Sequence, residues 1–114
     1  MPKPNVTITV RKAAAATAIL DIQGEVTGFA EDVLMDAYTR ASKEGARIIA
    51  LNFSNLDYMN SSGIGLLVTL LVRVQRQKQQ LRAFGLSEHY QQIFELTRLN
   101  EAIGIYDVEA AAIG

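Results

Sequence analysis

Apolar and polar residues follow two different periods along this chain, which predicts strands and helices in turn. Val6 to Val10 alternates with a period of two, as expected of a half-buried strand. Thr17 to Ile22 repeats the β-branched character, so the Arg11 to Ala16 stretch between them is predicted to be a hairpin connection. Arg47 to Phe53 and Leu81 to Leu86 are nearly all apolar, which is typical of strands covered on both faces.

Three segments between and after these strands show helical spacing. The first follows a loop at Gly24 to Gly28, is capped by Thr27, and ends at Gly45, where glycine permits a left-handed turn. Its apolar stripe is made of Phe29, Val33, Leu34, Ala37, Tyr38 and Ala41. The second runs from Gly63 to about Lys78 and is apolar almost all round in its first half. The third is capped by Ser87, carries Ile93, Phe94 and Leu96, and precedes a last strand at Ile103 to Val108.

Strands that alternate with helices predict an α/β fold with parallel strand pairs and right-handed crossovers. The opening hairpin adds an antiparallel edge, so the sheet is expected to be mixed. A chain of 114 residues suffices for one core, and neither an internal repeat nor a linker interrupts it. We therefore expect one domain over residues 1–114, complete at both ends.

Charge and residue types exclude several classes of function. The formal net charge is −1, and the basic cluster Arg73, Arg76, Lys78 and Arg82 is typical of a solvated helix end, so no nucleic-acid partner is expected. The chain has no cysteine and a single histidine, His89, which leaves no thiolate or paired-histidine metal site. Since no nucleophile and base pair or cofactor loop is visible either, we expect no cofactor and no enzymatic activity.

Nothing in the sequence predicts a membrane location. The N-terminal residues 1–5 lack the apolar core of a secretion signal. The longest apolar run, Ile64 to Leu71, is far shorter than the roughly 20 residues that span a bilayer. We therefore expect a soluble, cytoplasmic protein without a membrane partner.

The most informative stretch, Asn52 to Gly65, joins a buried strand to the start of a helix. In open α/β sheets, this is where ligand sites are usually found. Asn60, Ser61 and Ser62 are all suitable helix caps, and the free N–H groups of the helix start favour an anion. A phosphoserine at this turn would be tolerated locally and would add about −1.5 to −2 of charge.

This stretch resembles the signature of STAS domains, which include bacterial anti-sigma factor antagonists and the tails of some anion transporters. The motif is Asn60-Ser61-Ser62-Gly63-Ile64-Gly65 before a Leu/Val-rich helix. The likeness extends to Gly24-Glu25, to the Leu81 to Gly85 strand, and to the Ile93 to Leu99 segment. It therefore covers nearly the whole chain.

The resemblance implies partner switching. An unphosphorylated antagonist binds an anti-sigma factor that is also a serine kinase. Phosphorylation of Ser61 then releases the antagonist from the kinase. Ser62 is the alternative phosphorylation site. A serine phosphatase would reset the cycle, and a weak homodimer is also expected. The residues that the resemblance assigns to partner binding are Gly24, Glu25, Thr27, Tyr58, Met59, Asn60, Ser61, Ser62, Gly63 and Ile64.

Two alternatives remain open. Asn60 and Thr27 stand where many antagonists have acidic residues, which favours a scaffold or sensory module that is never phosphorylated. The helix start could instead bind a small anion or nucleotide. Gly63 and Gly65 are interpreted as close-packing positions, and the surface around Leu66 and Leu70 as a candidate contact with another protein or a second copy.

Overall fold

A computed structural model describes residues 5–114 as a five-stranded sheet in the order β1-β2-β3-β4-β5. β1 (Val6–Ala14) and β2 (Thr17–Val26) form the antiparallel hairpin at one edge. β3 (Ile48–Met59), β4 (Gln80–Phe84) and β5 (Gly104–Tyr106) extend the sheet in parallel. The predicted mixed α/β sheet is confirmed. The first four residues, part of the stretch that lacks a secretion signal, lie outside the described residues.

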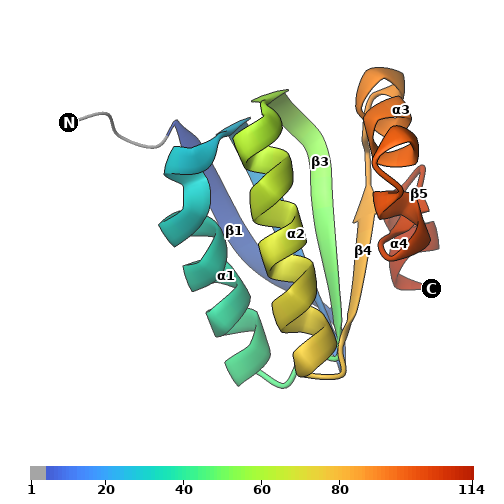
Figure 1. Cartoon of the computed structure of the whole chain (residues 1–114). Coiled ribbons are helices and arrows are strands. Elements are labelled where there is room, and N and C mark those ends of the chain that lie inside the picture. The colour runs from blue at the N-terminus through green and yellow to red at the C-terminus, as the bar shows by residue number, and fades with distance from the viewer. Residues whose placement is uncertain (1–4) are drawn as a thin grey trace.

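Helices cover the two faces of the sheet unequally. α1 (Glu31–Lys43), α2 (Ser61–Arg76) and α3 (Glu88–Leu96) lie on one face, and the short α4 (Glu109–Ile113) lies on the other (Figure 1). Two 3₁₀ turns, η1 (Gly28–Ala30) and η2 (Leu99–Glu101), precede α1 and follow α3. No helix within residues 5–114 is long and apolar enough to cross a membrane.

The core explains why β3 is apolar on both faces. Ile49 and Leu51 point to the three large helices, where they are fully buried with Leu20, Leu67 and Phe94. On the opposite face, a smaller cluster under α4 contains Ala50 with its neighbours Ile19, Phe84 and Ala112. A strand covered on both sides cannot carry alternating polar residues without burying them.

One ionic cluster ties α4 to the open face of the sheet. The Arg11 guanidinium donates to both carboxylate oxygens of Asp21 and, at 2.6 Å, to Glu109 at the start of α4. Asp21 Oδ1 also accepts a hydrogen bond from the Asn52 amide at 2.8 Å. The bonds from Arg11, and then that from Asn52, hold the pKa of Asp21 below its ordinary value.

β2 and β3 are longer than predicted. Gly24 to Val26, expected in a loop, belong to β2, and β3 continues to Met59. The two strands pair along this whole length, with register irregularities at Asp21/Gln23 and at Gly24/Glu25. These irregularities accommodate polar residues and a positive-φ glycine, features that favour a loop when the sequence is considered alone.

The chain ends differ from prediction too. The last strand is shorter than Ile103 to Val108, and α4 was not predicted. Phe29, assigned to the apolar stripe of the first helix, is 60% exposed, and Leu96, named as an apolar residue of the third helix, is 85% exposed. Phe29 lies in η1 before the helix begins, and Leu96 is the last residue of α3, where the sheet no longer covers it.

Candidate functional site

The predicted site residues meet where β2 and β3 end and α2 begins. Val26 and Met59 are paired in register, and the Asn60 N–H donates to the Val26 carbonyl at 3.3 Å. Only Asn60 separates β3 from α2. The ten residues assigned to partner binding therefore lie at one end of the molecule, which we call the α2 N-terminal end.

Asn60 is the helix cap, and the two serines are not. Its side-chain Oδ1 accepts a hydrogen bond from the Gly63 N–H at 2.9 Å. Ser61 and Ser62 are the first two residues of α2, and both are exposed. Their hydroxyls do not cap the helix, and their N–H groups belong to the positively polarised start of the helix.

Gly63 lets α2 approach the end of β2 closely. A Cβ at this position would lie 2.0 Å from the Val26 carbonyl oxygen and 2.9 Å from Met59 Cγ. The close-packing prediction is confirmed for Gly63. It is wrong for Gly65, because a Cβ there would have no atom within 4 Å.

The site residues divide into a buried framework and an exposed surface. Gly24, Met59 and Gly63 are buried, and they form the framework of the site. Ser61, Ser62 and Tyr58 are exposed, Tyr58 by 49%. The partly buried members are Glu25, Thr27, Asn60 and Ile64. Thr27 caps the 3₁₀ turn η1, since its Oγ1 accepts from the Phe29 N–H at 3.3 Å.

Residues from α3 complete the site. Tyr90 Oη accepts a hydrogen bond from the Met59 N–H at 2.9 Å. At this point β3 extends beyond the end of β4. An open groove of about 250 Å³ lies between the start of α2 and α3. It is lined by Met59, Asn60, Ser61, Ile64, Ile93 and Thr97. The sequence did not assign Tyr90, Ile93 or Thr97 to the site, because only the tertiary fold brings α3 to this end.

The chain segments that contribute to the α2 N-terminal end carry acidic side chains. Segments 24–33, 54–65 and 84–97 contain no lysine or arginine. Their acidic residues are Glu25, Glu31, Asp32, Asp57, Glu88 and Glu95. An anion at Ser61 would therefore be stabilised by the helix start and by no basic side chain from these three segments. A tight small-anion site normally needs such a side chain, so the anion-binding alternative gains no support here.

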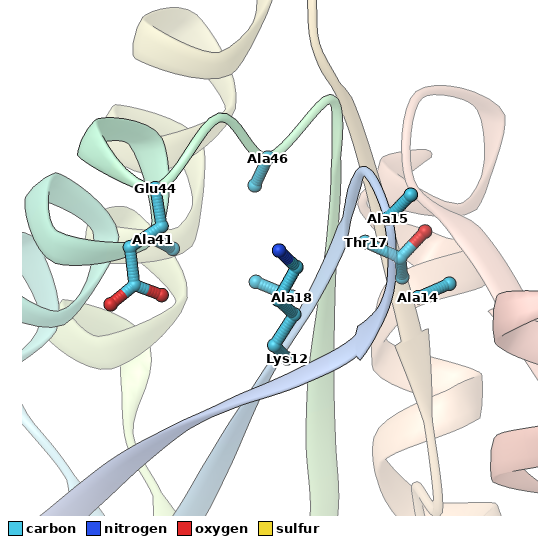
Figure 2. A pocket seen from close by; sticks show the side chains of 8 residues that line it. All are labelled: Lys12, Ala14, Ala15, Thr17, Ala18, Ala41, Glu44 and Ala46. Atoms are coloured by element: carbon cyan, nitrogen blue, oxygen red, sulfur yellow. The ribbon is translucent and has the colours of Figure 1, made fainter.

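Other parts of the described structure offer little for ligand chemistry. A hollow at the opposite end of the molecule, between the β1–β2 hairpin and α1, has room for about 10 Å³, which is at most one water molecule (Figure 2). Lys12, Ala41, Glu44 and Ala46 are among the side chains around it. Residues 5–114 contain no group of three or more acidic or histidine side chains that could hold a metal ion.

Known proteins resemble this chain in sequence and in fold. Residues 6–112 match the family model described as the STAS domain. A relative from Staphylococcus aureus, named anti-sigma-B factor antagonist, is 29% identical over 84 residues, which are 74% of this chain and 78% of that protein.

Two solved structures show the same fold. An anti-sigma factor antagonist from Mycobacterium paratuberculosis superposes with a TM-score of 0.77 at 14% identity, covering 99% of this chain and 96% of its own. The Bacillus cell fate determinant SpoIIAA in its phosphorylated form superposes with a TM-score of 0.71 at 19% identity, covering 94% and 96%.

Proposed function

The chain belongs to the STAS domain family, and on that premise we propose that it is an anti-sigma factor antagonist controlled by phosphorylation at Ser61. In its unphosphorylated form it binds an anti-sigma factor that is also a serine kinase. Phosphorylation releases that partner, and a serine phosphatase restores binding. The proposal treats residues 1–114 as one STAS domain and includes a weak homodimer as a further state.

The observation that carries this proposal is the position of Ser61. It is the first residue of α2, it is exposed, and Asn60 rather than Ser61 caps the helix. A kinase can therefore modify its hydroxyl without removing the cap. The start of a helix also favours a negative charge, by about 0.3–1 kcal/mol, so a phosphate there leaves the fold intact.

Release follows from charge and desolvation. A phosphate adds about −1.5 to −2 of charge to an end of the molecule whose segments already carry acidic side chains. When a partner covers this surface, the dianion loses water and finds no basic side chain in the neighbouring segments of this chain. An uncompensated charge buried in this way costs about 3–5 kcal/mol, which is enough to end a moderate-affinity complex.

The named relatives support the assignment to a class of regulators. The Staphylococcus aureus relative is named as an antagonist of an anti-sigma factor, and SpoIIAA has been solved in a phosphorylated form. Antagonists of this kind are regulatory binding proteins and not enzymes, in agreement with the prediction from the sequence.

The test uses four forms of the protein as baits in lysate from the source cells: wild type, Ser61→Ala, Ser61→Glu and Ser62→Glu. Ser62→Glu is the matched control, because it places the same charge one residue further along the same helix. We expect a serine kinase with anti-sigma activity on the alanine and Ser62→Glu baits and not on the Ser61→Glu bait. Identical prey on all four folded baits would instead favour a scaffold that phosphorylation does not control.

A further inference from the structure

The side of α2 that points away from the sheet is uncharged over most of its length. Its central row consists of the exposed residues that lie within about 100° of the helix circumference: Ser61, Gly65, Val68, Thr69, Val72 and Arg76. Val68 and Val72 are 43% and 41% exposed. A Cβ at Gly65 would have no atom within 4 Å, so nothing in this chain hinders the close approach of another helix there. We call these six residues the outer row of α2.

The outer row of α2 has the same spacing when it is followed from either end. Its members are separated by four, three, one, three and four positions. A twofold axis that crosses the helix between Val68 and Thr69 therefore relates the row to itself in the opposite direction. In two copies related by this axis, the α2 helices are antiparallel and Gly65 of one copy lies opposite Val72 of the other. The row is thus self-complementary, as the interface of a symmetric dimer must be.

α1 lies beside α2 and runs in the same direction (Figure 1). At their starts, a Cβ on Gly28 would lie 3.5 Å from Ser62 Cβ. At their ends, the Gln79 amide donates to Ser42 Oγ at 3.1 Å. The twofold axis lies across both helices, so α1 of one copy also comes to lie against α1 of the other, antiparallel to it.

Charge on the two helices is complementary in this arrangement. The exposed acidic residues lie in the first half of α1 and the exposed basic residues in the second halves of both helices: Glu31, Asp32 and Asp36, and Arg40, Lys43, Arg73 and Arg76. None of them forms an ion pair with any of residues 5–114. Glu44, just after α1, instead lines the hollow beside the β1–β2 hairpin (Figure 2). Antiparallel copies therefore set acidic starts against basic ends.

We propose that a second copy of this chain packs on the outer row of α2, antiparallel, and that phosphorylation of Ser61 strengthens this dimer. The register sets Ser61 of each copy opposite Arg76 of the other, so the dimer contains this pair twice. The segments around Ser61 in its own chain have no lysine or arginine, whereas the second copy supplies a guanidinium for the phosphate. This inference rests on the proposed function for the phosphorylation of Ser61.

The dimer covers the α2 N-terminal end of both copies, so it excludes the anti-sigma factor. Phosphorylation then does more than release the antagonist, because it also holds the released copies in a form that cannot compete for the partner. A face of two helices is small for a stable interface, so the unphosphorylated dimer is weak. The sequence placed a contact with a second copy around Leu66 and Leu70, but both are buried, and their exposed neighbours make the contact instead.

The first test compares the purified full chain carrying serine or phosphoserine at position 61, with the phosphoserine incorporated during synthesis so that no kinase is needed. Sedimentation equilibrium should give a dimer dissociation constant about tenfold lower for the phosphorylated form. Val68→Glu and Arg76→Glu should each remove this gain. The matched controls Val108→Glu and Lys12→Glu replace exposed residues outside α1 and α2, and they should leave the gain unchanged. Circular dichroism verifies that each variant is folded.

The second test determines the direction of the helices with single cysteines, since the chain has none of its own. Thr69→Cys lies beside the twofold axis, so a short thiol crosslinker should join two copies. The cysteines of Gln75→Cys lie about 20 Å apart along antiparallel helices, so the same reagent should not join them. Parallel packing would join the copies at both positions.

Three results would overturn the inference: equal dissociation constants for the two forms, a phosphorylated dimer that folded Val68→Glu leaves unchanged, or equal crosslinking at positions 69 and 75. Both tests use purified protein without a partner, so they do not depend on the pull-down from lysate. Identical prey on all four baits would contradict the proposed function and leave the dimer standing. A phosphorylated form that does not dimerise, together with loss of the kinase on the Ser61→Glu bait, would do the opposite.

Discussion

At the scale of single residues, two glycines of α2 have opposite surroundings although one residue separates them. Gly63 lies against the Val26 carbonyl, whereas Gly65 faces open space. The sequence motif contains both and cannot distinguish them, because close approach is a property of the neighbouring strand. The same applies to Asn60, which resembles Ser61 and Ser62 as a capping residue but alone occupies the capping position.

The two glycines give opposite predictions for alanine substitution. Gly63→Ala forces a Cβ into the Val26 backbone, so we expect a loss of about 1–3 kcal/mol in the free energy of unfolding. Gly65→Ala meets nothing and restricts the unfolded chain, so we expect a gain of roughly 0.5–1 kcal/mol. Urea denaturation of both variants measures this difference, and a loss at Gly65 equal to that at Gly63 would contradict the packing described here.

Asp21 predicts a change of stability in acid. Its pKa is lowered in the folded state, so its carboxylate stabilises the fold above the ordinary aspartate pKa of about 3.9 and loses this effect as the pH falls through the lower folded value. Because both side chains of the Arg11–Asp21 pair remain partly exposed to solvent, the contribution at neutral pH is a few tenths to about 1 kcal/mol. Asp21→Asn should therefore be less stable than wild type at pH 7 by this amount, and the two should converge as the pH falls below the lowered pKa of Asp21 in the folded state.

The control for this pH effect is Asp36→Asn, which replaces an exposed carboxylate on α1 for which the structure shows no ion pair. Thermal unfolding across the pH range should show no such convergence for Asp36→Asn. If the difference in unfolding free energy between Asp21→Asn and wild type stayed constant down to pH 2, the carboxylate charge would not be the cause of the stability difference.

At the scale of elements, a side-chain hydrogen bond links α3 to β3 beyond the end of β4. Tyr90 Oη accepts from the Met59 N–H, which would otherwise lack a partner strand. Tyr90→Phe should cost about 1 kcal/mol and speed hydrogen exchange at the Met59 amide. Tyr58→Phe is the control, because Tyr58 is 49% exposed and its hydroxyl makes no hydrogen bond to residues 5–114. Equal exchange at Met59 in both variants would argue against this attachment.

The elements also show what sequence patterns can and cannot predict. The predictions of Ser87 as the cap of α3 and of Gly45 as the left-handed end of α1 are confirmed, because capping and positive φ are local. The sequence did not predict the extensions of β2 to Val26 and of β3 to Met59. Each extension depends on pairing with the other strand, which lies about 30 residues away in the sequence. α4 was missed because five residues are too few to show helical periodicity.

At the scale of the whole molecule, the fold separates two tasks. The sheet and the buried faces of the helices form the hydrophobic core, while the α2 N-terminal end carries exposed polar residues. The motif predicts that the functional site lies at this end, and residues 6–112 match the STAS domain family model. The groove toward α3 could not be predicted, because its far wall is formed by residues about 30 positions further along the chain.

The central claim is that charge at Ser61 controls partner binding. The partner is first purified with the Ser61→Ala bait. The most direct measurement is then its affinity for this protein before and after phosphorylation at Ser61. Mass spectrometry verifies which residue is modified. The account predicts an unchanged fold by circular dichroism and an affinity weaker by at least about a hundredfold. Equal affinity for the two forms, with one phosphate on Ser61, would contradict it.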